Sequence, residues 1–429
     1  MDGGILDNVT NEDQSESGVV RFITAGSVDD GKSTLIGRLL HDSRAILEDQ
    51  FAAVERASQR RGQTAVDLSL ITDGLEAERE QGITIDVAYR YFATPRRKFI
   101  IADTPGHEQY TRNMVTGAST AEAAVVLIDA RKGLLPQSRR HIYLASLLGM
   151  AEIIVAINKM DLIGFDEAKF RAIRREVLDF AERLQSARVS FVPMSALLGD
   201  MVVDRGENLH WWTGPTLLEA LEAVDVMRSL HDLPLRLPVQ LVTRPDIAGL
   251  DGARGYLGRI ESGAIRQGQE ITVLPAGRNT TVKEIVSLEG PVKEAVAGDC
   301  VTLTLADDLD ISRGDLIAEL AQPPITGQQI NARLCWLSSE PFEPQRSYLL
   351  RHTTRTVKAR VRNVNARVDI HTLEREAFSE PLKMNDIVIA QLALQQPIAS
   401  DPYQANRATG AFILIDEVTN QTVAAGLID

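Results

Sequence analysis

The octapeptide Gly26–Ser33 constrains the fold of this chain more than any other stretch, because it reads G-x-x-x-x-G-K-S between two segments of different character. Val19–Ala25 before it is apolar and rich in β-branched residues, which predicts a strand, and residues 34–40 after it carry apolar side chains at helical spacing. A strand, a glycine-rich loop and a helix in this order form a phosphate-binding loop, in which backbone amides and the helix N-terminus face an anion. The sequence therefore predicts a triphosphate site built from Gly26, Ser27, Val28, Asp29, Asp30, Gly31, Lys32, Ser33 and Thr34.

The side chains of this loop have separate expected roles. Lys32 is expected to reach the β- and γ-phosphates, and the Ser33 hydroxyl is expected to bind Mg²⁺. Asp29 and Asp30 bring carboxylates close to a triphosphate and repel it unless they point away or meet a cation. Two interpretations stay open for Asp29, which either helps to hold a monovalent cation or points outward to the backbone or solvent. The outward interpretation applies to Asp30 as well.

Composition and charge restrict the class of protein. A chain of 429 residues with 44% apolar and 24% charged residues is typical of globular proteins and is long enough for roughly three domains of ~150 residues. The net charge of −13 argues against a chain dedicated to nucleic acid or to an anionic membrane. The N-terminal residues are acidic, no apolar run approaches the ~20 residues that cross a bilayer, and the two cysteines form no C-x-x-C pair. We expect a cytoplasmic protein.

The periodicity of the sequence changes twice. Residues 1–17 are expected to form a flexible tail, and residues 18–232 alternate apolar strands with helical stretches, which predicts a doubly wound, mostly parallel α/β sheet. Residues 233–325 contain short strands separated by glycine turns, which predicts a β-barrel domain, and residues 326–429 are expected to form a second one. The strands predicted for the first domain are Val19–Ala25, Ile85–Phe92, Lys98–Ala102, Ala123–Asp129, Glu152–Ile157 and Val189–Pro193. The predicted helices include Gln137–Leu148, Asp166–Leu184 and a segment within residues 46–62.

Three further motifs follow apolar strands in the order that a GTPase requires. The first is Asp103–Gly106, which reads D-T-P-G directly after residues 99–102. A carboxylate at the end of this strand can hold Mg²⁺, usually through a water, and Gly106 can bring its amide to the γ-phosphate with no side chain in the way. We therefore expect Asp103 to be a metal ligand beside Ser33, and include Thr104, Pro105 and Gly106 in the nucleotide site.

The other two motifs are expected to select the base. The carboxylate of Asp161 can accept hydrogen bonds from both N1–H and the 2-amino group of guanine, donors that adenine lacks. The methylenes of Lys159 can lie over the base, and the Ala196 amide can donate to guanine O6. The predicted ligand is therefore GTP with Mg²⁺, bound on the base side by Asn158, Lys159, Met160, Asp161, Ser195 and Ala196.

Two residues are expected to complete a hydrolytic switch. Thr84 is predicted to close on Mg²⁺ when the γ-phosphate is present, although it could instead only begin the next strand. His107 directly follows the D-T-P-G motif, where a water would attack the γ-phosphate, and is predicted to orient that water or to stabilise charge. Val28 and Ile83 would form an apolar gate that holds His107 away until a partner binds.

With these motifs the chain resembles the translational GTPase superfamily. The residues that carry the resemblance are Gly26–Thr34, Gly82–Ile85, Asp103–Glu108 and Asn158–Asp161, and a GTPase domain followed by two barrels accounts for nearly the whole chain. Within the superfamily the best match is the large, GTP-binding subunit of heterodimeric ATP sulfurylase, which is sulfate adenylyltransferase subunit 1.

That narrower match depends on particular positions. It is carried by Ser27 and Asp30 in the loop and by the residue sequences of the segments Ile71–Phe92 and His107–Met114. Elongation factors Tu and 1-alpha share the layout but usually have His in place of Ser27, His or Ser in place of Asp30, and Asn in place of Asp86.

The resemblance implies a function that composition and spacing do not. In that family the small partner subunit transfers the adenylyl group of ATP to sulfate, making adenosine 5′-phosphosulfate and pyrophosphate, and the large subunit couples GTP hydrolysis to this uphill synthesis. The resemblance thus implies a heterodimer in which this chain binds GTP and its switch remodels the partner's site.

Two other functions stay open. An elongation-factor-like GTPase that carries aminoacyl-tRNA would need a basic surface on the barrels, and the second barrel contains Arg351, Arg355, Lys358, Arg360 and Arg362, although such a run is usually a solvated face. The second open function is that of a GTP-dependent scaffold, which binds its nucleotide but barely hydrolyses it. Acidity does not decide between these functions, because an acidic protein can bind tRNA through one basic patch, but we expect no nucleic-acid partner.

Overall fold

The computed structural model describes residues 18–46, 48–60, 66–71, 86–107, 110–184, 188–225, 230–243, 254–344, 346–370, 372–378 and 382–429. The chain falls into two compact units, Met1–Val226 and Met227–Asp429. Two residues of the predicted switch, Ile83 and Thr84, lie outside the described residues, as does the predicted N-terminal tail.

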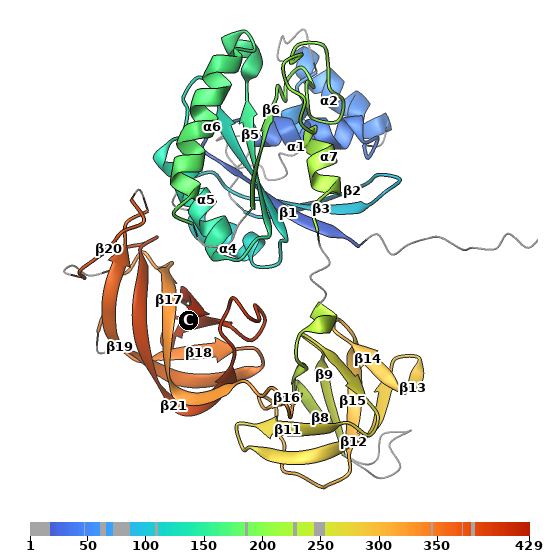
Figure 1. Cartoon of the computed structure of the whole chain (residues 1–429), viewed down its shortest axis with the longest axis vertical. Coiled ribbons are helices and arrows are strands. Elements are labelled where there is room, and N and C mark those ends of the chain that lie inside the picture. Colours follow the sequence, from blue (N-terminus) through green and yellow to red (C-terminus); the bar gives the residue numbers. More distant parts are fainter. Residues whose placement is uncertain are drawn as a thin grey trace, which may run out of the picture. The chain divides into compact units, whose positions relative to one another are not determined.

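A six-stranded sheet forms the centre of the first unit, in the order β2-β3-β1-β4-β5-β6. All neighbouring strands run parallel except β2, which is antiparallel to β3. Helices α4, α5 and α6 lie on one side of this sheet and α1 and α7 on the other (Figure 1). The predicted doubly wound, mostly parallel sheet is therefore confirmed, with the strands β1 Val20–Gly26, β2 Ala88–Ala93, β3 Lys98–Asp103, β4 Ala123–Asp129, β5 Glu152–Asn158 and β6 Arg188–Pro193.

The helices of this unit follow the predicted pattern closely. The three predicted helical segments correspond to α2, α5 and α6, and α6 is capped by Asp166, whose carboxylate accepts from the N–H groups of Ala168 and Lys169. Among the described helices, none combines the length and the apolar composition needed to cross a membrane. The helical elements are α1 Lys32–Asp42, α2 Glu48–Arg60, η1 Leu68–Ile71, α4 Thr111–Ala118, α5 Pro136–Leu147, η3 Met160–Ile163, α6 Glu167–Ala181 and α7 Leu217–Glu222.

One predicted strand begins later than expected. The pattern predicts a strand over Ile85–Phe92, whereas β2 covers Ala88–Ala93. The carboxylate of Asp86 accepts the N–H of Val87 at 2.7 Å, which occupies a donor that a continued strand would need for its ladder. Register with β3 accordingly starts at the pair Ala88 and Asp103.

The second unit contains two antiparallel β domains, as predicted. The first has the strand order β7-β16-β11-β12-β15-β9-β8 around a buried aliphatic core, with β13 on β12 and β10 paired with β14. Its elements are η4 Leu230–Asp232, β7 Arg236–Pro238, β8 Leu241–Thr243, β9 Gly255–Arg259, β10 Ala264–Arg266, β11 Glu270–Leu274, β12 Arg278–Ser287, β13 Gly290–Val292, β14 Glu294–Val296, β15 Cys300–Leu305 and β16 Leu316–Glu319.

The second β domain closes on itself, because β18 pairs with both β22 and β19. Its core includes Trp336, whose ring packs edge-on against Phe342 and Tyr348. Alternating burial along β19 reflects one face toward this core and one toward solvent. Its strands are β17 Ile325–Trp336, β18 Tyr348–His352, β19 Arg355–Val368, β20 Arg375–Glu376, β21 Ile387–Ser400, β22 Ala411–Asp416 and β23 Thr422–Ile428.

A buried ion pair joins the two β domains. Arg236 of β7 donates through Nε and Nη2 to the two carboxylate oxygens of Asp401 at 2.8 and 2.9 Å. The hydroxyl of Thr409 donates to the same carboxylate at 2.6 Å. Burial alone would raise the pKa of Asp401, but the hydrogen bonds from Arg236 and Thr409 hold it below its ordinary value. The pair is therefore ionised near neutral pH and fixes one barrel against the other.

We expect Arg236→Met to lower the free energy of unfolding by about 3–5 kcal/mol, because the Asp401 carboxylate would stay buried without its ion partner. The double variant Arg236→Met, Asp401→Leu should recover most of this loss, since it leaves no unpaired charge. Urea unfolding of the full chain measures both effects. A double variant that is as unstable as Arg236→Met would contradict this account.

Candidate nucleotide-binding site

The predicted motifs meet at one edge of the six-stranded sheet. In the parallel register Thr24 of β1 lies beside Asp103 of β3, and Asp129 of β4 lies beside Asn158 of β5. Pro193, which precedes the Ser195 motif, lies beside Ile157. Because the carboxyl ends of parallel strands share an edge, four sequence-distant motifs are brought together here. This edge is the expected location of a ligand in an open α/β sheet.

The phosphate loop is closed by backbone and side-chain contacts of its own. Gly31 has a φ of 95° and caps α1, and a Cβ at this position would lie 2.5 Å from Asn158 Nδ2, so only glycine fits. The N–H of Asp30 donates to Ser27 O at 3.2 Å, and the N–H of Leu35 donates to Gly31 O at 2.9 Å. The loop thus passes directly into the N-terminus of α1, where backbone N–H groups favour an anion.

The ammonium of Lys32 is turned into the loop. Its Nζ donates to Gly26 O at 3.0 Å and to Ser27 O at 3.1 Å, and the residue is only 7% exposed. Burial lowers the pKa of Lys32, and the charges of Asp103, Asp30 and Asp29 act in the opposite direction. A buried cation that is held only by carbonyl groups and nearby carboxylates fits a site for phosphate oxygens.

Asp30 does not point outward. It is 1% exposed, and its Oδ2 accepts the N–H of Ser27 at 2.7 Å, so the carboxylate lies inside the loop. Burial raises the pKa of Asp30 to about 6, against the Ser27 hydrogen bond and the charges of Lys32 and Lys132, which lower it. The Asp30 side chain thus contacts the backbone, as the outward interpretation allows, but it does so inside the loop and not at the surface.

The D-T-P-G segment packs against the phosphate loop. Asp103 is buried and its Oδ1 accepts from the Thr24 hydroxyl at 3.2 Å, while the Thr104 hydroxyl donates to Thr24 O at 2.7 Å. A Cβ on Gly106 would collide with Lys32 Nζ and with Gly26 O, so the absence of a side chain allows this close approach. Gly106 is thus next to the cation that is predicted to bind the γ-phosphate.

The donor set at this edge suits Mg²⁺ bound mainly by oxygen atoms that the protein does not supply. Among the described residues no group of three or more His, Cys, Asp or Glu side chains is placed to hold a metal ion. Ser33 and Asp103 offer one hydroxyl and one carboxylate, which fits an ion that keeps several waters and binds substrate phosphates. These residues therefore fit the predicted role, and Thr84 stays a prediction.

A single amide connects the phosphate loop to the base-recognition loops. Asn158 Nδ2 donates to Asp30 O at 2.8 Å, and Asn158 Oδ1 accepts the N–H of Ala196 at 2.9 Å. That N–H was expected to donate to guanine O6, so in this structure the amide of Asn158 competes for it. The hydroxyl of Ser195 donates to Asp161 Oδ1 at 2.7 Å, which orients the carboxylate that is predicted to read the base.

His107 lies where the sequence places it, directly after Gly106, and is partly exposed. Its carbonyl accepts the N–H of Tyr110 at 3.0 Å, and the two ring centroids are 6.1 Å apart. Val28 is also partly buried at the loop, while the other half of the predicted gate, Ile83, lies outside the described residues.

Three family models match consecutive parts of the chain. The elongation factor Tu GTP binding domain matches residues 17–228, elongation factor Tu domain 2 matches residues 256–318, and the GTP-eEF1A C-terminal domain-like model matches residues 329–429. Sulfate adenylyltransferase subunit 1 of Aeromonas hydrophila is 50% identical over 97% of this chain and 87% of its own length. The chain belongs to the sulfate adenylyltransferase subunit 1 family.

Two further relatives agree with this assignment. Sulfate adenylyltransferase subunit 1 of Laribacter hongkongensis is 51% identical over 96% of this chain and 85% of its own. The bifunctional enzyme CysN/CysC of Mycobacterium tuberculosis is 53% identical over 96% of this chain and 67% of its own. The family resemblance predicted from the loop and switch sequences is confirmed. The match to the elongation factor Tu GTP binding domain covers the whole sheet edge described above.

Sequence reasoning missed Asp129 as a residue of this site. Its carboxylate Oδ2 lies 3.2 Å from Lys159 Nζ, and Arg131 Nη2 donates to the same oxygen at 2.6 Å. Lys159 Nζ also donates to Asp29 O in the phosphate loop. The available signal was positional, because Asp129 ends a buried parallel strand at the same edge as Asp103 and Asn158.

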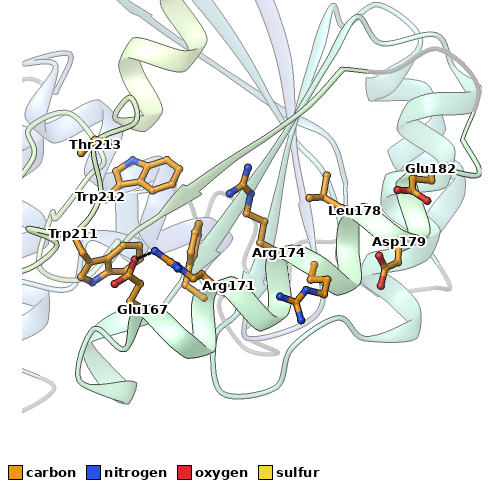
Figure 2. Close-up of a pocket in the computed structure, with 11 residues that line it drawn as sticks. Glu167, Arg171, Arg174, Leu178, Asp179, Glu182, Trp211, Trp212 and Thr213 are labelled. Carbon is orange, nitrogen blue, oxygen red and sulfur yellow. Dashed lines mark hydrogen bonds and ion pairs between the residues drawn. The ribbon is translucent and has the colours of Figure 1, made fainter.

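A groove of about 560 Å³ lies along α6, and the described residues that line it include none of the predicted nucleotide residues (Figure 2). Trp211 and Trp212 form one end of it and pack on Phe170 with ring centroids 5.2 and 5.3 Å away. The indole N–H of Trp211 donates to Phe165 O at 2.9 Å. The aromatic cluster therefore holds the turn that follows Asp161 through the hydrogen bond from Trp211 to Phe165.

We expect Asp30→Asn to change the pH dependence of stability in the nucleotide-free protein. The folded pKa of about 6 lies above the unfolded value, so the folded protein binds the proton more tightly and wild-type stability falls as pH rises from about 4 to about 6. The variant lacks this fall and should gain about 3 kcal/mol relative to wild type at pH 7. Urea unfolding at pH 4, 5, 6 and 7 tests this, and parallel curves would contradict it.

Proposed function

We propose that this chain is the GTP-hydrolysing subunit of a sulfate adenylyltransferase (ATP sulfurylase). In this proposal GTP hydrolysis is coupled to the synthesis of adenosine 5′-phosphosulfate and pyrophosphate from ATP and sulfate, and a small partner subunit carries out the adenylyl transfer. The observation that supports it most is 50% identity to a subunit 1 relative over 97% of this chain and 87% of that relative. The name "subunit 1" itself implies that a partner exists.

The residues at the sheet edge have distinct tasks in GTP hydrolysis. Gly26–Thr34 provides backbone donors and the Lys32 ammonium for the phosphates, and Asp161, oriented by Ser195, accepts the guanine N–H groups. Ser33, Asp103 and Thr84 would hold Mg²⁺, which when bound neutralises charge on the β- and γ-phosphate oxygens. Thr104, Pro105 and Gly106 shape the γ-phosphate end, with Gly106 beside Lys32.

Coupling requires that the state of the γ-phosphate changes the partner's site. The segment after β3 contacts the phosphate loop through Gly106 and continues through His107 into α4. A change at Lys32 can therefore move His107 and α4 while the sheet stays in place. By linkage, a partner that favours one position of this segment also changes the affinity for GTP.

The basic residues of the second barrel give elongation-factor activity less support than the family relationship gives the sulfate adenylyltransferase proposal. Of those five residues, Arg355 forms an ion pair with Asp315 at 3.1 Å and Lys358 forms one with Glu417 at 2.9 Å. Their charges are thus partly neutralised within the chain. The family relationship, and not this surface, is the reason that we favour the sulfate adenylyltransferase proposal.

We expect His107→Ala to lower the rate of GTP hydrolysis by about 10²-fold or more while the Kd for GTP stays within a few-fold, because the imidazole is predicted to act on the attacking water and not on binding. The matched control is His210→Ala, an exposed histidine of the same unit. Single-turnover hydrolysis measures the rate. Equal rates for His107→Ala and the control would exclude the proposed role and favour a scaffold that barely turns GTP over.

The proposed coupling is tested by the heterodimer reconstituted with the small subunit of a related sulfate adenylyltransferase. With ATP and sulfate present, addition of GTP should raise the yield of phosphosulfate, and a non-hydrolysable GTP analogue should not. Phosphosulfate formation that ignores GTP would sink the coupling proposal. Stable capture of aminoacyl-tRNA instead of the small subunit would favour the elongation-factor alternative.

A further inference from the structure

We infer that Asp129 is a positioning residue for guanine-nucleotide binding, which holds the Lys159 ammonium between the phosphate loop and the base-recognition motif. This role rests on the proposed binding of GTP and adds to it a residue that belongs to none of the sequence motifs. Asp129 ends β4, and its side chain is 0% exposed. A fully buried carboxylate at the ligand edge of the sheet must have partners.

The first partner is Lys159. Its Nζ lies 3.2 Å from Asp129 Oδ2 and donates to Asp29 O, so one ammonium joins the end of β4 to the phosphate loop. Lys159 itself has a left-handed φ of 62°, a conformation that non-glycine residues rarely adopt. Its position is therefore maintained by the contacts at the tip of the side chain as well as by the backbone.

The second partner fixes the direction of the carboxylate. Arg131 donates to Asp129 Oδ1 through its backbone N–H at 2.9 Å and its Nε at 3.0 Å, and to Oδ2 through Nη2 at 2.6 Å. This fork holds the plane of the carboxylate, which leaves Oδ2 facing Lys159. Burial alone would raise the pKa of Asp129, but the hydrogen bonds from Arg131 and Lys159 hold it well below its usual range, so the group is an anion at neutral pH.

The charges explain why the carboxylate is needed. Asp129 is a buried anion between two cations, so loss of its charge would remove the attraction that holds the Lys159 ammonium beside the end of β4. Lys159 would then lose the contact that places its methylenes where the guanine is predicted to lie. Asp129 contacts Lys159 of the base-recognition motif, whereas Gly106 lies beside Lys32 at the predicted γ-phosphate end, so we expect the loss to fall on binding and not on the chemical step.

The test uses Asp129→Asn, which has nearly the same shape without the charge, in the full chain. We expect the Kd for fluorescent GTP and GDP to rise about 30-fold and KM for GTP to rise in parallel, with kcat within about 3-fold of wild type. If Asp129 acts through Lys159, then Asp129→Asn in a Lys159→Gln background should change the Kd by less than about 3-fold. A general structural role would give losses that multiply in the double variant.

The matched control is Asp416→Asn. Asp416 is also a buried aspartate and pairs with Arg346 at 2.6 Å, but it belongs to the second unit, so its loss should lower stability and leave the Kd for GTP unchanged. If Asp129→Asn does not fold, Asp129→Glu keeps the charge but displaces the carboxylate, and it should weaken GTP about 5-fold with kcat retained.

The outcomes separate this inference from the proposed function. Wild-type protein that binds no GTP would overturn the proposed function itself. Wild-type protein that binds GTP, together with an unchanged Kd for Asp129→Asn or for Asp129→Glu, or with multiplicative losses in the double variant, would overturn only the role of Asp129.

Discussion

The amide of Asn158 is the interaction on which the candidate site depends. It is the last residue of a buried parallel strand, and its two polar atoms are used in opposite directions, one toward Asp30 O and one toward the N–H of Ala196. A longer or shorter side chain could not make both hydrogen bonds from the same strand position. Because the side-chain amide of Asn158 comes so close to Gly31, the loop cannot accept a side chain at position 31. The phosphate and base halves of the site are therefore one hydrogen-bonded unit.

The second organising feature is a set of buried charges that surround the expected ligand. Lys32 is held by two carbonyl oxygens, which are weaker partners for an ammonium than phosphate oxygens would be. Asp103 and Asp129 are buried at this edge of the sheet, and Asp30 is buried in the loop. Each is bound by donors from the chain itself, namely Thr24, Arg131 and Ser27. The charges are thus fixed before nucleotide arrives, which lowers the reorganisation that binding requires.

The sequence could predict what depends on local pattern. The strands before Asp103 and Asn158, the helix after Lys32 and the change to β structure in the second half all follow from apolar periodicity and motif spacing, and the structure confirms them. Contacts between distant residues could not be read in this way. Arg236 and Asp401 are 165 residues apart, and Asp129 meets Lys159 only because β4 and β5 are neighbours. The switch role of Thr84 stays a prediction that rests largely on the family resemblance.

The inward carboxylate of Asp30 gives a physical meaning to the sequence feature that set this family apart from elongation factors. The two distinguishing loop positions, Ser27 and Asp30, are bonded to each other twice, through the Ser27 N–H to Asp30 Oδ2 and the Asp30 N–H to Ser27 O. Ser27 is only 8% exposed, and its carbonyl accepts from Lys32. A larger side chain at this position, such as histidine, would therefore have to fit into a nearly buried space. A basic side chain at position 30 would bring a second cation next to Lys32 inside the loop and could not accept the Ser27 N–H when protonated. Asp30 therefore serves this internal turn of the phosphate loop with its carboxylate, and Ser27 serves it with its backbone N–H and carbonyl.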